Sequence, residues 1–142
     1  MLYCLSLGSL LTMPKTQLSS REDIATLVAK FYAAARQDEL LGPIFNKAIS
    51  NWPAHLDTIT DFWEGNLLFT KAYHGDPLAA HAKMDAANNH TIDSVHFGVW
   101  LTLWFKTIDD NFTGHVAEKA KRQARKMSTF LHLHIFKMRP DN

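Results

Sequence analysis

Histidine is the residue type in this sequence with the most scope for chemistry. The chain holds eight histidines but one cysteine, Cys4, which is too few for an internal disulfide or a thiolate metal cluster. Three histidines lie on or beside the apolar faces of expected helices, and these are His55, His81 and His96. A neutral imidazole can ligate a metal or carry a proton, but a lone histidine on an apolar face is most often structural. The surroundings of these three residues therefore decide between the two roles.

Other kinds of catalytic site find little support. No Glu-x-x-His pair is present, and the acidic residues mostly stand at helix starts, which argues against a di-iron bundle. The sequence also lacks a nucleophile-elbow glycine pattern and a phosphate-binding glycine loop. Four Trp, nine Phe and three Tyr residues supply flat surfaces for a dense core or for the walls of a pocket. Histidines that flank an aromatic pocket favour a planar cofactor with a central metal, because such a metal can take a single protein imidazole.

The stretch GDPLAAH, residues 75–81, indicates how one of these histidines is positioned. Asp76 can accept hydrogen bonds from the first amides of a helix, and Pro77 suits the first helical position. Turn-forming residues return in DAANNHT, residues 85–91, which predicts a helix of one or two turns with His81 near its middle. So short a helix is not stable by propensity alone. A ligand bonded to His81 is one interaction that would hold it in place.

Apolar periodicity predicts longer helices on both sides of this segment. One follows the capping pattern of Ser19 and Ser20 and runs to Ala35, and Gly42 and Pro43 then break the pattern. Three further helices are expected over residues 53–67, 91–108 with Thr91 as cap, and 113–136 with Phe130 on the inner face. No β-hairpin signal is present, so the fold class is all-α.

Composition limits the domain organisation and the partners. With 142 residues, 46% hydrophobic and 20% charged, the chain suits one globular domain, which we expect over residues 19–142. Residues 1–18 are expected to be an extension that is flexible or partly a start-site artefact. The net charge of +1 gives no electrostatic reason to expect nucleic acid or an anionic membrane as a partner. The apolar opening run is too short to span a bilayer, and the cysteine usage suits a reducing compartment, so we expect a cytoplasmic protein.

From about Ile24 onward the sequence resembles the third group of the truncated haemoglobins. Four motifs in the right order carry the resemblance: FYAAARQDELLGPIF at 31–45, HLDTITDFWEG at 55–65, GDPLAAH at 75–81 and HFGVWLTLWFKTIDDNF at 96–112. The chain also lacks a Gly-Gly pair, and this group is recognised in part by lacking the glycine motifs of the others. The resemblance implies a truncated globin fold, a two-over-two helical sandwich that holds a haem b group.

The resemblance also implies a role for each matched residue. The proximal iron ligand falls on His81 and the distal histidine on His55, while His90 and His96 stay open as competing ligands. Residues in contact with the haem are expected to be Phe45, His55, Ile59, Phe62, Trp63, Leu78 and His81. The bound ligand is expected to meet Ile59 and two hydrogen-bond donors, Tyr32 and Trp100.

The function implied is binding of O2 and other small diatomic ligands, such as CO or NO, at a five-coordinate iron. Oxygen transport or storage is one use, and redox chemistry on the ligand, such as NO or peroxide detoxification, is another. Redox turnover would need an unidentified reductase as partner, because the sequence has no flavin or nicotinamide site. Whether the protein is an enzyme therefore stays open, and we expect a monomer or weak dimer. The alternative is a haem-free helical interaction or sensor module with structural histidines.

Overall fold

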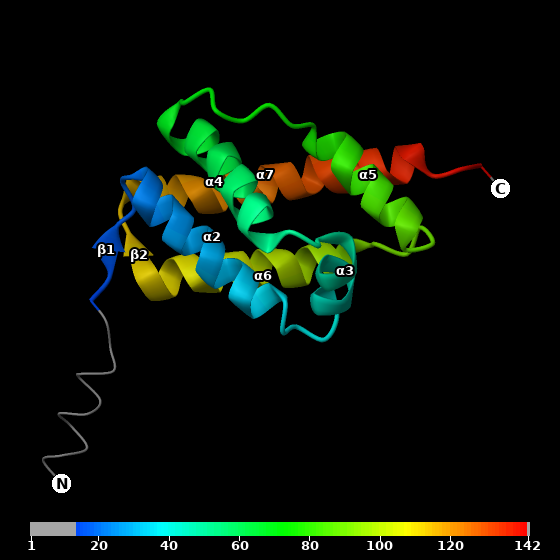
Figure 1. Ribbon diagram of the computed structural model, residues 1–142, viewed down its shortest axis with the longest axis horizontal. Helices are drawn as coiled ribbons and strands as arrows, with labels where there is room; N and C mark the ends of the chain where they lie inside the picture. The colour runs from blue at the N-terminus through cyan, green and yellow to red at the C-terminus, as the bar shows by residue number, and fades with distance from the viewer. Residues whose placement is uncertain (1–13, 142) are drawn as a thin grey trace, which may run out of the picture.

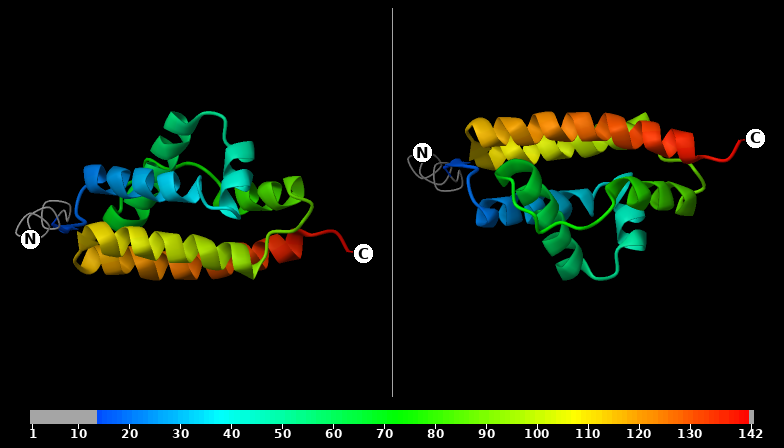
Figure 2. Two further views of the ribbon diagram at one scale, coloured as in Figure 1. Left: turned by 90° about the horizontal axis from the view of Figure 1, so that it is seen from below. Right: turned by 90° about the horizontal axis from the view of Figure 1, so that it is seen from above.

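The computed structural model describes residues 14–141, which form two layers of helices. One layer pairs α2 (Arg21–Ala35) with α4 (Trp52–Leu68), and the other is the antiparallel pair α6 (Ser94–Asn111) and α7 (His115–Met138) (Figure 1). The side views in Figure 2 show α6 and α7 together on one side of the molecule, with α2 and α4 on the other. This arrangement confirms the all-α, two-over-two fold.

Two shorter helices complete the helical part of the described chain. Helix α3 (Leu41–Ala48) contacts α2 and α6, and α5 (Pro77–Ala87) lies along the C-terminal half of α7. Helix α5 has 11 residues, so it is longer than the one or two turns expected, because it continues past Asp85 to Ala87. It is still too short to be stable alone.

The chain before α2 is attached to the domain by a small parallel strand pair. Strand β1 (Thr16–Gln17) pairs with β2 (Phe112–Thr113), and the Leu18 amide donates to the Thr113 carbonyl at 3.2 Å. Leu18 is 2% exposed. The last residues of the expected 1–18 extension therefore pack against the domain, whereas residues 1–13 lie outside the described residues. Within residues 14–141 no helix has the length and apolar character needed to cross a bilayer.

A stack of tryptophans joins the two layers. Trp63 of α4 stacks on Trp104 of α6 with ring centroids 4.6 Å apart, and Trp104 stacks on Trp100 at 5.6 Å. Phe31 of α2 packs edge-on against Trp100 and Trp104 and is 1% exposed. Full burial of a side chain such as Phe31 contributes about 1.5–3 kcal/mol. The layers are therefore held together by large buried aromatic surfaces.

Helix starts follow local capping, with one correction. Ser20 caps α2 in a reciprocal box with Asp23, and Asp76 caps α5 as expected. Helix α6 begins at Ser94 with Asp93 as its cap, so the prediction that Thr91 caps it is wrong. The Thr91 hydroxyl instead donates to the Asn88 carbonyl at 2.6 Å and belongs to the preceding turn.

Two further predictions on local structure are wrong. Gly42 and Pro43 lie inside α3 instead of in a break, and a Cβ at Gly42 would stand 2.5 Å from the Arg36 carbonyl oxygen. Glycine therefore allows α3 to begin directly against the end of α2. Phe130, expected on the inner face of α7, is 68% exposed, because Leu131 takes the buried position beside it.

Candidate functional site

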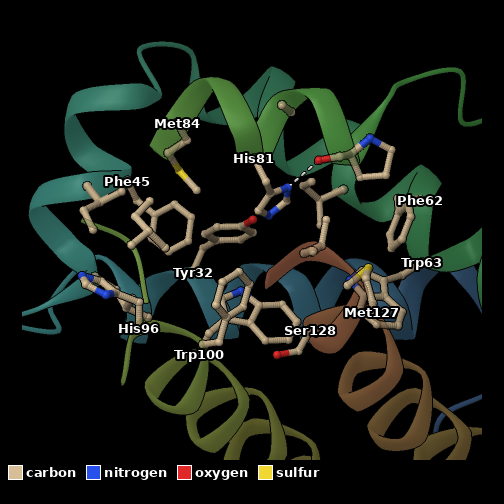
Figure 3. A pocket seen from close by; sticks show the side chains of 18 of the residues that line it. Tyr32, Phe45, Phe62, Trp63, His81, Met84, His96, Trp100, Met127 and Ser128 are labelled. Carbon is tan, nitrogen blue, oxygen red and sulfur yellow. Dashed lines mark hydrogen bonds between the residues drawn. The ribbon is translucent and has the colours of Figure 1, made fainter. Parts of the chain in front are cut away.

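An apolar cavity lies beneath α5, between it and the layer of α6 and α7 (Figure 3). Each of the six helices in the described residues contributes to its lining. Seven residues assigned to the site from the sequence lie there: Tyr32, Phe45, Ile59, Phe62, Trp63, His81 and Trp100. The cavity thus brings together residues from motifs that are far apart along the chain.

Helix α5 presents one stripe of residues to this cavity. Pro77, Ala80, His81 and Met84 all line it, and their spacing of three and four residues defines one face of a helix. The cap residue Asp76 fixes the start of the helix, because its side chain accepts the Ala79 amide at 3.1 Å. The sequence GDPLAAH therefore sets where α5 begins and puts His81 on the same helix face as Pro77.

The His81 ring is oriented by a carbonyl one turn before it. Its Nδ1 lies 2.7 Å from the Pro77 carbonyl oxygen, and a carbonyl only accepts, so Nδ1 carries the hydrogen. No partner is recorded for Nε2 among residues 14–141. Burial lowers the pKa of His81, and the Pro77 carbonyl offsets part of this shift. The neutral ring, with a lone pair on Nε2, is the form of histidine that ligates metals.

Tyr32 forms the opposite wall with a cluster of rings around it. It is 6% exposed, and the rings of Phe45, Trp52 and His55 pack edge-on against it at 5.5, 5.4 and 5.2 Å. Its hydroxyl lies 3.2 Å from His55 Nε2. Burial raises the pKa of the Tyr32 hydroxyl, so it stays protonated, and burial lowers the pKa of His55. Tyr32 can therefore donate into the apolar space when His55 Nε2 carries its hydrogen and donates to the Tyr32 oxygen.

Trp100 supplies a second donor beside the cavity. Its ring is fixed by Phe31 at 5.3 Å and Trp104 at 5.6 Å. The indole N–H of Trp104 donates to the Ala120 carbonyl at 3.3 Å, whereas that of Trp100 has no recorded acceptor in the described part of the chain. A rigid indole with an uncommitted N–H can donate to a ligand in the cavity.

Two residues assigned to the site from the sequence lie outside this lining. Leu78 follows Pro77 on α5, falls beside the stripe and is 39% exposed at a neighbouring groove that includes Phe62 and Phe130. His55 lies behind Tyr32 and reaches the cavity only through the hydroxyl of that residue. The competing histidines are also bonded through Nδ1: His90 Nδ1 contacts Asp85, and His96, which lines the cavity, has Nδ1 beside Asp93. Within the described residues these contacts leave Nε2 open in both, so the choice of His81 rests on its place in the cavity-facing stripe of α5.

Sequence reasoning missed several lining residues. Met84 continues the helical stripe of Pro77 and His81, so helical spacing was a usable signal for it. Tyr73 stands in the connection before α5, packs edge-on against Phe62 at 5.1 Å, and approaches Gly75 so closely that a Cβ there would clash. Met127 and Ser128 come from α7 and had no sequence signal that tied them to the pocket.

Comparisons with known proteins support the fold. No family model matches the chain. A group 3 truncated haemoglobin of Campylobacter jejuni is 34% identical over 99 residues, which cover 67% of this chain and 74% of that protein. The crystal structure of a group III truncated haemoglobin from Campylobacter jejuni superposes with a TM-score of 0.78 and 28% identity, and covers 90% of this chain and 100% of that one.

Proposed function

The chain belongs to the group III truncated haemoglobins, and we propose that it binds one haem b group through His81 and holds a diatomic ligand on the side of the cavity where Tyr32 and Trp100 lie. The family implies a haem protein of the globin type. The observation that carries the finer proposal is the hydrogen bond from His81 Nδ1 to the Pro77 carbonyl, which leaves Nε2 available.

The residues of the cavity fit a haem group. A porphyrin needs apolar walls, and Phe45, Ile59 and Phe62 supply flat or aliphatic surface there. Its iron needs one imidazole with the far nitrogen held in place, which His81 and Pro77 provide. When bound, haem supplies an iron centre that takes small ligands and exchanges electrons. The chain's own part would be to orient His81 and to keep water from the side of the cavity where Tyr32 and Trp100 lie.

On that side of the cavity the chain offers two donors in fixed positions. Tyr32 and Trp100 are both held by neighbouring rings, so they need little reorganisation to meet a ligand. Donors placed in a water-poor pocket favour a ligand that carries partial negative charge over an uncharged one. We therefore propose O2 as the ligand that these residues discriminate from CO, with NO as a further ligand.

We extend the proposal to redox chemistry on the ligand, such as NO or peroxide detoxification. Retention by two donors suits ligand chemistry or sensing better than rapid oxygen delivery. An external reductase is needed as partner, because the chain itself has no nicotinamide or flavin fingerprint.

The test is a haem titration of the apoprotein followed by absorption spectroscopy of the ferrous form. We expect one haem per chain with a five-coordinate spectrum, loss of that spectrum in His81→Gly, and partial recovery when imidazole is added. His90→Ala and His96→Ala should keep the wild-type spectrum. Loss of ligation in either of these two variants, with His81→Gly unchanged, would overturn the assignment of His81. Failure of the wild-type chain to bind haem would support a haem-free helical module.

A further inference from the structure

The helix that carries His81 is attached to the rest of the protein in an unusual way. The one buried side chain of α5 is a carboxylate: Asp85 is 1% exposed, while Leu78 on the same helix is 39% exposed. The buried positions of α2, by contrast, are Ile24, Leu27 and other apolar or aromatic residues. Apolar burial therefore does little to fix α5, and its attachment depends on what Asp85 contacts.

Asp85 is bonded to two segments of the chain that lie outside α5. Arg139, which follows α7, donates from Nε to Oδ2 at 3.0 Å and from Nη2 to Oδ1 at 3.2 Å. The Ile92 amide donates to Oδ1 at 3.0 Å, and His90 Nδ1 lies 3.3 Å from Oδ2. Arg139 also donates to the Ile92 carbonyl. We name these four residues the Asp85 clasp.

The clasp joins the end of α5 to two other parts of the chain. Its members come from α5, from the connection between α5 and α6, and from the residue that caps the end of α7. A two-point contact between a guanidinium and a carboxylate fixes orientation as well as distance. Because this contact is directional, it sets the rotation of α5 as well as its distance from α7.

The position of the clasp links it to His81. Asp85 stands four residues after His81, and Pro77 stands four residues before it, so all three lie along one side of α5. Pro77 orients the imidazole within the helix, and Asp85 sets where the helix stands relative to α7. The rotation of α5 therefore decides whether Nε2 faces the cavity.

We propose that the Asp85–Arg139 ion pair is the positioning element that holds α5, and with it His81, against the cavity, so that residue 139 controls how firmly the cofactor is retained. The inference rests on the proposed role of His81 as the iron ligand. Asp85 and Arg139 are positioning residues, because neither lines the cavity.

The test begins with the apoprotein, where no haem is involved. Amide hydrogen exchange is measured over residues 77–87 in the wild type, Arg139→Gln, Arg139→Lys and Asp85→Asn. Lys106→Gln is the matched control, because it breaks an exposed ion pair with Asp110 on α6. We expect exchange in α5 to rise about tenfold or more in Arg139→Gln and Asp85→Asn, and less in Arg139→Lys, which keeps the charge but loses the two-point contact. Amides of α2 should be unchanged in every variant, which excludes global unfolding.

The second arm uses the haem-loaded protein. Transfer of haem to an excess of a scavenging apoglobin should be about tenfold faster in Arg139→Gln than in the wild type. The iron–histidine stretching band in resonance Raman spectra should shift in Arg139→Gln and not in Lys106→Gln. Unchanged exchange in α5 overturns the inference and leaves the proposed function intact. Faster exchange with unchanged haem retention also overturns it, provided that His81→Gly loses ligation. If His81→Gly keeps ligation as well, the proposed role of His81 is what has failed.

Discussion

The two walls of the pocket are held in place by different physical interactions. The wall that carries Tyr32 belongs to the apolar core, where Phe31 and Trp104 are each 1% exposed. The wall that carries His81 is α5, whose single buried side chain is Asp85. One wall is thus held by non-directional burial of large surfaces and the other by a directional ion pair.

This difference has consequences for local stability. A wall built into the core opens only when the whole domain unfolds, whereas an element with few buried apolar contacts can open alone. Helix α5 is such an element, so the His81 side of the pocket can loosen while the Tyr32 side stays intact. Substitutions on the two walls should therefore differ in their effect on global stability.

The largest effect is expected from a substitution in the core behind the wall that carries Tyr32. Trp104→Ala removes a ring that stacks on Trp63 and Trp100 and should lower the free energy of unfolding by about 3–5 kcal/mol, because a cavity is left behind. Leu78→Ala on α5 is the matched control and should change it by less than about 0.5 kcal/mol. Urea unfolding of the apoprotein measures both. Equal losses would mean that α5 is as firmly embedded as the core.

A second prediction concerns what the rigid wall offers to the ligand. Tyr32→Phe removes the hydroxyl and keeps the ring, so oxygen dissociation should be about 10-fold to 150-fold faster, the equivalent of about 1.5–3 kcal/mol for a hydrogen bond to a charged acceptor. Trp100→Phe should act in the same direction, and the double variant should be non-additive because both donors serve one ligand. Stopped-flow dissociation of O2, with CO as the less affected reference, is the measurement. If both single variants release O2 at the wild-type rate, Tyr32 and Trp100 are core residues that do not donate to the ligand.

The third prediction concerns the effect of low pH on the wall that carries His81, which depends on the Asp85–Arg139 ion pair. The hydrogen bonds from Arg139, Ile92 and His90 outweigh burial and lower the pKa of Asp85 below its usual 3.8. A group with a lowered pKa stabilises the fold above its unfolded pKa, and this contribution is lost as pH falls through the folded value. The difference in unfolding free energy between the wild type and Asp85→Asn should therefore be constant above about pH 5 and narrow below about pH 4. A difference that stays constant to pH 2.5 would exclude this contribution.

Sequence reasoning predicted most of the wall that carries Tyr32 but only part of the wall that carries His81. The resemblance to the truncated haemoglobins implied that Tyr32, Phe62 and Trp100 meet at one pocket, and all three line the cavity. Helical periodicity by itself predicted only the apolar faces on which Phe62 and Trp100 lie. The GDPLAAH stretch likewise predicted where α5 begins and that His81 lies on it, since both depend on the local cap. These features are encoded within a few residues, so they can be read from the sequence.

The structural features that sequence reasoning missed depend on contacts between residues that are far apart in the chain. Asp85 and Arg139 are 54 positions apart, and DAANNHT alone suggests a turn where the carboxylate in fact supports a longer helix. Helix α3 starts with Leu41 and Gly42 and has no capping side chain at Leu40, so its start depends on packing against the end of α2 and on Asp38, whose carboxylate accepts the Leu40 and Leu41 amides at 2.9 Å. Phe130 has the helical spacing of a core residue, but it is 68% exposed, because Leu131 beside it takes the buried position.

The smallest effect is expected at His55, which stands behind the rigid wall. Its Nε2 lies 3.2 Å from the Tyr32 hydroxyl, so the ring meets the ligand only through that hydroxyl or when it moves aside. A hydrogen bond between two neutral groups contributes about 0.5–1.5 kcal/mol, which limits the effect of His55→Ala on oxygen dissociation to about 2-fold to 12-fold.

His55 also stands one turn into α4 beside Trp52 at 5.7 Å, where it can obstruct the approach of a ligand. The association rate of CO should therefore change in His55→Ala while oxygen dissociation changes less than in Tyr32→Phe. Stopped-flow measurement of both rates on the same preparations decides the point. If His55→Ala releases O2 as fast as Tyr32→Phe does, His55 itself donates a hydrogen bond to the ligand. The wall that carries Tyr32 is then less rigid than its packing implies.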